Sequence, residues 1–148
     1  MSYDMTRFLN AQDSGVYEMA LREMRTGQKR SHWMWFIFPQ IEGLGWSLMA
    51  KKYEFASIDE AREYLENETL RARLLEISNV VYNLKSNSIS FIFWEPDDLK
   101  FMSCMTLFYL ITKDMNVPEY DVFKKNLDKY YDGQMCQHTL SKFEEANR

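Results

Sequence analysis

One twelve-residue segment, residues 29–40 (KRSHWMWFIFPQ), constrains the fold more than any other part of the chain. After His32 the segment is apolar on every side, so it cannot form a surface helix that has one polar face. We expect it to be buried, with its basic and hydroxylated start at the edge of the core. A basic entrance beside tryptophan side chains is suited to a flat, anionic ligand such as a nucleotide.

The composition favours helices arranged around one core. The chain has 148 residues, which is long enough to bury a single core, and 46% of them are hydrophobic. Its five glycines and three prolines are too few for a sheet protein with many tight turns. We therefore predict an all-α fold: a compact multihelical single domain that spans residues 1–148.

Helical spacing of apolar residues supports this prediction. Ser57 with Glu60 forms the pattern of a capping box, and Asn67 is a second candidate N-cap. Residues 86–94 alternate hydroxyl and bulky side chains, but a lone strand has no partner, so we expect a turn or a short helix there. Helical periodicity follows Asp13, Ser57, Asn67, Pro96 and Pro118, and continues in the tail from His138.

Charge, cysteine content and hydropathy exclude several classes of protein. The net charge of −4 opposes nonspecific binding of bulk nucleic acid. Cys104 and Cys136 do not form a disulfide framework or a zinc-ligand pattern, so we expect reduced thiols, no metal and no cofactor. Residues 1–4 lack the start of a signal peptide, and no apolar stretch is long enough for a membrane span. These features predict a cytoplasmic protein with no membrane partner, and no pattern indicates its oligomeric state.

The polar start of segment 29–40 is the first candidate site. Ser31 is a candidate N-cap for a short helix that begins at His32, which would point free backbone N–H groups at an anion. Lys29 and Arg30 would flank that anion. The alternative is a solvated helix end, where cations offset the helix dipole. The basic strip consists of Arg22, Arg25, Lys29 and Arg30, and Glu23 interrupts it.

The aromatic part of the same segment offers a stacking surface. Trp33 or Trp35 would stack on a base, and Gln40 would contact a polar edge of the ligand. The alternative is that both indoles belong to the core, which is the commoner fate of each taken alone. His32 is the only well-placed titratable base in the segment, so it is a candidate general acid–base if catalysis occurs.

A second candidate site surrounds the start of a later helix. Trp94 offers another stacking surface, while Asp98 and Lys100 lie at the helix start. Ser103 and Thr106 are three residues apart and share one face, where they would meet ribose or phosphate oxygens. Asp98 is the second candidate for acid–base catalysis. The alternative is that Asp97 and Asp98 only compensate the helix dipole, while the two hydroxyls hydrogen-bond to the backbone of the same helix. We expect both candidate sites to line one cavity.

These two segments resemble the bacterial family called domain of unknown function 1810, which is sometimes labelled calpastatin. Residues 27–40 and Gly43-Leu44-Gly45 match its first signature. Its second signature is matched by Asp98, Lys100, Ser103 and residues 105–108. The resemblance covers nearly the whole chain, implies a compact helical fold and carries no established activity. The chain departs from the family at Phe93-Trp94, where a small Phe-Gly turn is usual, and at Cys136, where an acidic residue is common.

A fainter similarity connects the chain to the NAD- and ADP-ribose-associated hydrolase family. It rests on residues 70–75, the aromatic turn at Trp94, and a helix through Leu107 and Leu110. Where that family has an acidic residue before the aromatic turn, this chain has Phe91 or an apolar neighbour. The similarity implies a nucleotide-shaped pocket more than it implies hydrolysis.

The leading functional hypothesis is that the protein binds a small anionic nucleotide, such as an ADP-ribose or NAD derivative, in a basic and aromatic pocket. Two alternatives remain open. One is an ADP-ribosyl hydrolase, and the other is a non-enzymatic protein-interaction module.

Overall fold

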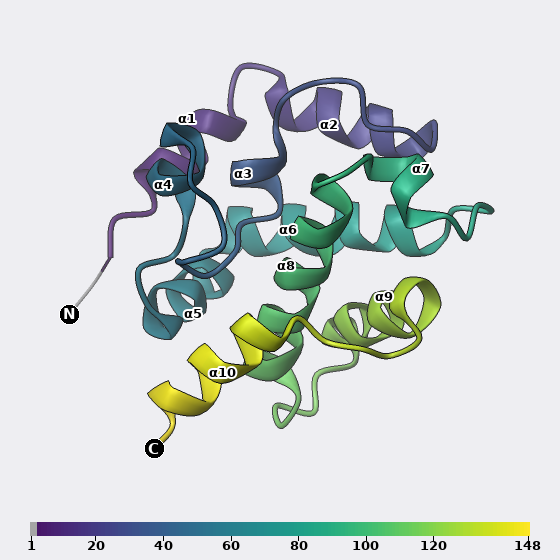
Figure 1. Ribbon diagram of the computed structural model, residues 1–148. Helices are drawn as coiled ribbons and strands as arrows, with labels where there is room; N and C mark the ends of the chain where they lie inside the picture. The colour runs from purple at the N-terminus through teal and green to yellow at the C-terminus, as the bar shows by residue number, and fades with distance from the viewer. Residues whose placement is uncertain (1–2) are drawn as a thin grey trace.

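The all-α prediction is confirmed by the computed structural model, which describes residues 3–148. That part of the chain contains ten α-helices, one 3₁₀ turn and no strand (Figure 1). A single parallel bridge joins Ile41 to Phe55. The helices are α1 (Thr6–Gln12), α2 (Val16–Arg25), α3 (Met34–Ile37), α4 (Leu48–Tyr53), α5 (Ile58–Glu66), α6 (Glu68–Tyr82), α7 (Ile89–Phe93), α8 (Asp97–Thr112), α9 (Asp121–Tyr131) and α10 (Gln137–Ala146).

Helix α8 runs through the middle of the molecule, and α7, α9 and α10 pack against it (Figure 1). It is apolar around most of its circumference, which is the pattern of a helix that is buried rather than laid on a surface. Helix α6 packs against α2, α5 and α9, so α9 contacts both α6 and α8. Through Asp97, the first turn of α8 also forms an ion pair with Lys29, which is far away in the sequence.

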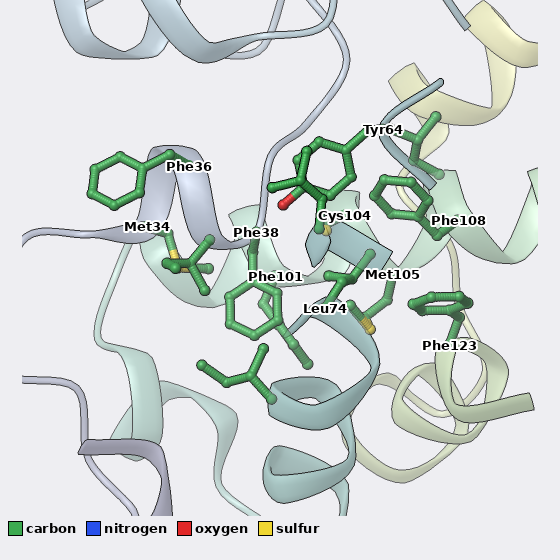
Figure 2. Packing of buried hydrophobic residues seen from close by; sticks show 14 of the residues in the cluster. Met34, Phe36, Phe38, Tyr64, Leu74, Phe101, Cys104, Met105, Phe108 and Phe123 are labelled. Carbon is green, nitrogen blue, oxygen red and sulfur yellow. The ribbon is translucent and has the colours of Figure 1, made fainter. Parts of the chain in front are cut away.

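Aromatic side chains fill the core around α8. The ring of Phe38 lies 4.9 Å from that of Phe101, and Phe93 stacks on Phe101 at 4.8 Å. Farther along α8, the Phe108 ring lies 5.9 Å from that of Tyr64 (Figure 2). The prediction that the apolar part of segment 29–40 is buried is confirmed, because five of its residues are at most 7% exposed: Trp33, Met34, Phe36, Ile37 and Phe38.

Two predicted helix caps are present. The Ser57 hydroxyl accepts a hydrogen bond from the Glu60 backbone N–H at 3.1 Å, and the Asn67 side chain accepts one from Leu70 at 3.1 Å. Helices α5 and α6 therefore begin where we predicted. The second half of the capping box is wrong, because the Glu60 carboxylate accepts from the Ala56 backbone N–H at 2.7 Å instead of from Ser57.

Other boundaries differ in detail from the predictions. Asp13 does not cap α2, which follows Gly15 in a left-handed conformation (φ 86°). Pro118 opens a 3₁₀ turn, Pro118–Tyr120, before α9 begins. The ambiguous residues 86–94 contain the short helix α7, as expected. Helices α1 and α4 are short, and their apolar periodicity was too brief to predict them.

Candidate functional site

Glu23 on α2 organises the polar start of segment 29–40. Its carboxylate accepts hydrogen bonds from the backbone N–H groups of Arg30 (2.8 Å) and Ser31 (3.0 Å). It also accepts one from the Ser31 hydroxyl and one from the Trp33 indole N–H, the latter at 2.9 Å. Glu23 is only 9% exposed, so a single buried carboxylate binds four donors from one loop.

The environment of Glu23 favours its charged form. Burial alone raises the pKa of a carboxyl group, and burial is the largest single influence here. The hydrogen bonds from Ser31, Arg30 and Trp33 together outweigh it, so the pKa of Glu23 lies below its ordinary value. The group is therefore an anion at neutral pH, held inside the protein by its donors.

The predicted helix start at His32 is wrong. Helix α3 begins at Met34, Trp33 is its N-cap residue, and Ser31 caps nothing. The backbone N–H groups that we expected to face an external anion bind Glu23 instead. The physical reason is that a carboxylate from α2 supplies a stronger acceptor than water would, which holds residues 30–33 in a non-helical loop.

Lys29 lies inside the structure rather than at a solvent-exposed entrance. Its backbone N–H donates to the Ile92 carbonyl at 2.8 Å, which ties the loop to α7. Its Nζ lies 3.0 Å from Asp97 Oδ2 and 5.2 Å from the centre of the Trp33 ring. Lys29 is only 9% exposed, so Arg30 is the exposed cation of this pair.

Arg30, His32 and Trp94 line a surface hollow of about 440 Å³, which we call the Arg30 hollow. Arg30 and His32 are exposed, and their side chains make no hydrogen bond or ion pair with residues 3–148. Trp94 follows α7 with φ 65° and is 58% exposed, so its indole lies open to solvent. The full lining is Gln28, Lys29, Arg30, Ser31, His32, Phe93, Trp94 and Asp97.

Three other predicted residues line a different hollow. Gln40, Lys100 and Ser103 border a space of about 390 Å³, which we call the Trp46 hollow. Trp35 lies beside it, with Lys100 Nζ 5.6 Å from its ring centre. The full lining is Gln40, Leu44, Gly45, Trp46, Ser47, Ala50, Pro96, Leu99, Lys100 and Ser103.

The expectation that both candidate sites line one cavity is therefore wrong. The start of α8 lies between the two hollows, because Trp94 and Asp97 border one and Pro96 and Leu99 border the other. The Asp97 carboxylate links them through its ion pairs, 3.0 Å to Lys29 and 3.4 Å to Lys100. The sequence predicted residues that do lie around the start of α8. It could not show that side chains there separate two hollows.

The remaining predicted residues line neither hollow. Trp33 is fully buried in the core, as the alternative reading had it. Asp98 is 8% exposed, and its carboxylate accepts from the Leu99 backbone N–H at 2.9 Å. Thr106 is fully buried and donates to the Met102 carbonyl at 2.8 Å. His32 and Asp98, the two candidate catalytic residues, are thus not brought together.

Sequence reasoning missed Glu23 and Glu54 as functional candidates and gave no role to Trp46. The available signal for Glu23 was its position beside Ala20 and Met24 on the apolar face of α2, where an acidic residue needs partners when buried. Trp46 and Glu54 flank the short helix α4, which carried no clear periodicity.

Metal-binding clusters and membrane-spanning helices are both absent from residues 3–148. No group of three or more His, Cys, Asp or Glu side chains there is arranged to hold a metal ion. None of the helices in the same residues combines the length and the apolar character that crossing a bilayer requires.

Comparison with known proteins gives two matches and one negative result. A family model described as "Protein of unknown function (DUF1810)" matches residues 2–143. The chain is also similar to the crystal structure of the conserved hypothetical protein Rv1873 from Mycobacterium tuberculosis, with 41% sequence identity and a TM-score of 0.85. That match covers 94% of this chain and 95% of the other. No curated protein matches the chain.

Proposed function

Because the chain belongs to the DUF1810 family, whose description names no activity, we propose a function from the chain's own geometry: it binds a small anionic ligand with a planar ring in the Arg30 hollow. A nucleotide of the ADP-ribose or NAD type has this chemistry. One observation carries the proposal. The side chains of Arg30, His32 and Trp94 differ in chemistry, line the same hollow, and make no hydrogen bond or ion pair with residues 3–148.

The frame around these side chains is held in place. Glu23 binds the backbone of Arg30 and Ser31, so the loop that carries the guanidinium has fixed ends. Lys29 ties the same loop to α7 through its backbone and to α8 through its ion pair with Asp97. A frame that is already ordered loses less entropy when a ligand binds, which favours affinity.

Each free side chain suits one part of a nucleotide. The Arg30 guanidinium can donate two parallel N–H bonds to a phosphate group. The Trp94 indole offers a face for base stacking, a contact worth about 1–3 kcal/mol per base. His32 lines the same hollow and can hydrogen-bond a ribose or phosphate oxygen. Because Glu23 takes the backbone N–H groups, phosphate recognition depends on side-chain charge, and we expect affinity to fall as salt rises.

Thermal unfolding with added nucleotides tests the proposal. ADP-ribose, NAD and AMP are the probes, and a ligand at 100 times its Kd should raise the unfolding midpoint by about 5–10 °C. Arg30→Gln should abolish most of that rise. Arg30→Lys should keep part of it, because lysine retains the charge but loses the two-pronged contact. A panel in which no probe moves the midpoint by about 1 °C would contradict the proposal.

The matched control is Arg22→Gln. Arg22 is an exposed arginine of the same basic strip, but it does not line the Arg30 hollow. It should leave the nucleotide-induced rise unchanged. An equal loss in both variants would show that general positive charge attracts the nucleotide and that the hollow does not bind it.

Hydrolysis of an ADP-ribosyl group is the second candidate. His32 lines the Arg30 hollow, but Asp98 does not, so only one of the two predicted acid–base groups is in position. Chromatography of ADP-ribose compounds after incubation with the protein separates binding from turnover. Products that disappear in His32→Ala would favour hydrolysis.

A protein-interaction module is the third candidate, and exposed apolar side chains favour it. Phe91, in the middle of α7, is 56% exposed, and Trp94, which follows that helix, is 58% exposed. Such neighbouring aromatic groups are common at protein interfaces. This candidate gains weight if nucleotides have no effect on unfolding.

A further inference from the structure

The Trp46 hollow has features of a ligand site that the proposed nucleotide does not use. It lies between the loop before α4 and the first turn of α8. Its volume of about 390 Å³ falls within the range of small-molecule sites. An adjoining inner space of about 10 Å³, room for about one water, shares Gln40 and Lys100 with it and extends to Trp35 and Glu54.

The walls of this hollow are apolar and uncovered. Trp46 is 85% exposed and Leu99 is 58% exposed, and they come from two different elements. One exposed apolar residue is ordinary, but two that border one hollow offer a flat molecule a contact on each wall. Gly45 holds the Trp46 loop close to α4, because a Cβ at Gly45 would lie only 2.5 Å from the Cβ of Ala50.

The inner end of the hollow is polar, and one buried acceptor there lacks a donor. Gln40 is partly exposed and is not among the buried groups without a partner, so its amide is open to solvent. Glu54 Oε1 is buried and has no hydrogen-bond partner within residues 3–148. An unsatisfied buried acceptor costs about 1–3 kcal/mol, and more when it is charged. The Ser103 hydroxyl donates to the Leu99 carbonyl at 3.0 Å, so only its acceptor side is free.

Ion pairing at the inner end leaves Glu54 without a partner. Lys100 Nζ lies 3.4 Å from Asp97 Oδ1, a carboxylate that it shares with Lys29. Glu54 has no ion pair within residues 3–148, so a ligand that donates hydrogen bonds would meet an unpartnered acceptor there. Lys51 Nζ lies 5.2 Å from the centre of the Trp46 ring.

We propose that the Trp46 hollow is a second binding site, which takes a small aromatic molecule that carries an N–H-donating carboxamide or amidine group. The ring contacts Trp46 and Leu99. The N–H groups donate to the Gln40 amide oxygen and toward the Glu54 carboxylate, directly or through one water in the inner space. This proposal and that for the Arg30 hollow can be tested independently, because the two hollows share no lining residue.

Three probes of nearly equal shape test the chemistry. Benzamide is neutral and donates N–H bonds, benzamidine is a cation that donates them, and benzoate only accepts. The chain has four tryptophans, so their indole N–H signals in a ¹H–¹⁵N NMR spectrum report on binding separately, with assignment by Trp→Phe variants. Benzamide and benzamidine at about 1–10 mM should move the Trp46 signal and leave that of Trp94 in place. Benzoate should leave the Trp46 signal in place, whatever it does at Trp94 in the Arg30 hollow.

Variants of the intact chain identify the acceptor. Glu54→Gln should weaken benzamidine binding about tenfold or more, because it removes a charged acceptor. Glu66→Gln, at an exposed position of α5, is the matched control and should change nothing. The proposal is overturned if benzoate moves the Trp46 signal as strongly as the other two probes, if no probe moves that signal, or if Glu54→Gln leaves benzamidine binding unchanged.

Discussion

Replacing Glu23 with alanine is expected to lower the free energy of unfolding by about 3–5 kcal/mol. The variant leaves four donors without their acceptor: two backbone N–H groups, the Ser31 hydroxyl and the buried Trp33 indole N–H. Trp33 is fully buried, so water cannot replace the lost bond there without opening the core. Urea unfolding followed by circular dichroism measures the change.

The control is Glu18→Ala on the same helix. Glu18 is exposed in the first turn of α2, where a carboxylate only interacts with the helix dipole, so its loss should cost less than about 1 kcal/mol. Similar losses in the two variants would show that the Glu23 bonds add no more than a surface charge does.

Acid provides a second measurement on Glu23. Because its folded-state pKa lies below the ordinary value of 4.5, the unfolded chain binds its proton more readily. Its contribution to stability is therefore complete above about pH 4.5 and is lost as the pH falls through the folded-state pKa. The difference in free energy of unfolding between the parent and Glu23→Gln should therefore narrow as the pH falls below about 4.5. A difference that stays constant would contradict the role of the charge.

Truncating Phe108 to alanine is expected to cost about 3–5 kcal/mol. The ring is fully buried at the middle of the molecule, 5.9 Å from Tyr64 and 5.6 Å from Phe123 (Figure 2). Three elements meet at this ring, so the structure cannot collapse into the cavity by moving one of them. The urea midpoint and its slope measure the loss.

Phe91→Ala makes the same chemical change at a surface position. Phe91 is 56% exposed on α7, so the variant should stay within about 0.5 kcal/mol of the parent. A loss at Phe91 as large as that at Phe108 would mean that α7 depends on its outer face for stability.

Local patterns were enough to predict most of the helices. Ser57 and Asn67 cap α5 and α6 because the cap bonds join residues only three apart, Glu60 and Leu70. The burial of segment 29–40 followed from its uniform apolar character. The helix start at His32 could not be predicted, because the competing bonds come from Glu23, seven to ten residues away on a different element.

The candidate site shows the same division between short-range and long-range information. Residue types alone indicated that Arg30, His32 and Trp94 belong near a ligand, and all three line one hollow. The same reasoning included Thr106, which α8 turns into the core. Which side of a buried helix faces a hollow depends on what packs against it, and an apolar helix carries no periodicity that would show this.

The helical class, the main helix starts and the burial of the tryptophan-rich segment can be predicted from residue spacing, because each depends on neighbours within a few positions. Long-range contacts set the rest: Glu23 occupies the anion position of the loop, Lys29 is an internal ion-pair partner, and two hollows flank α8. Hydrogen bonds and ion pairs between elements depend on distances that local spacing does not encode.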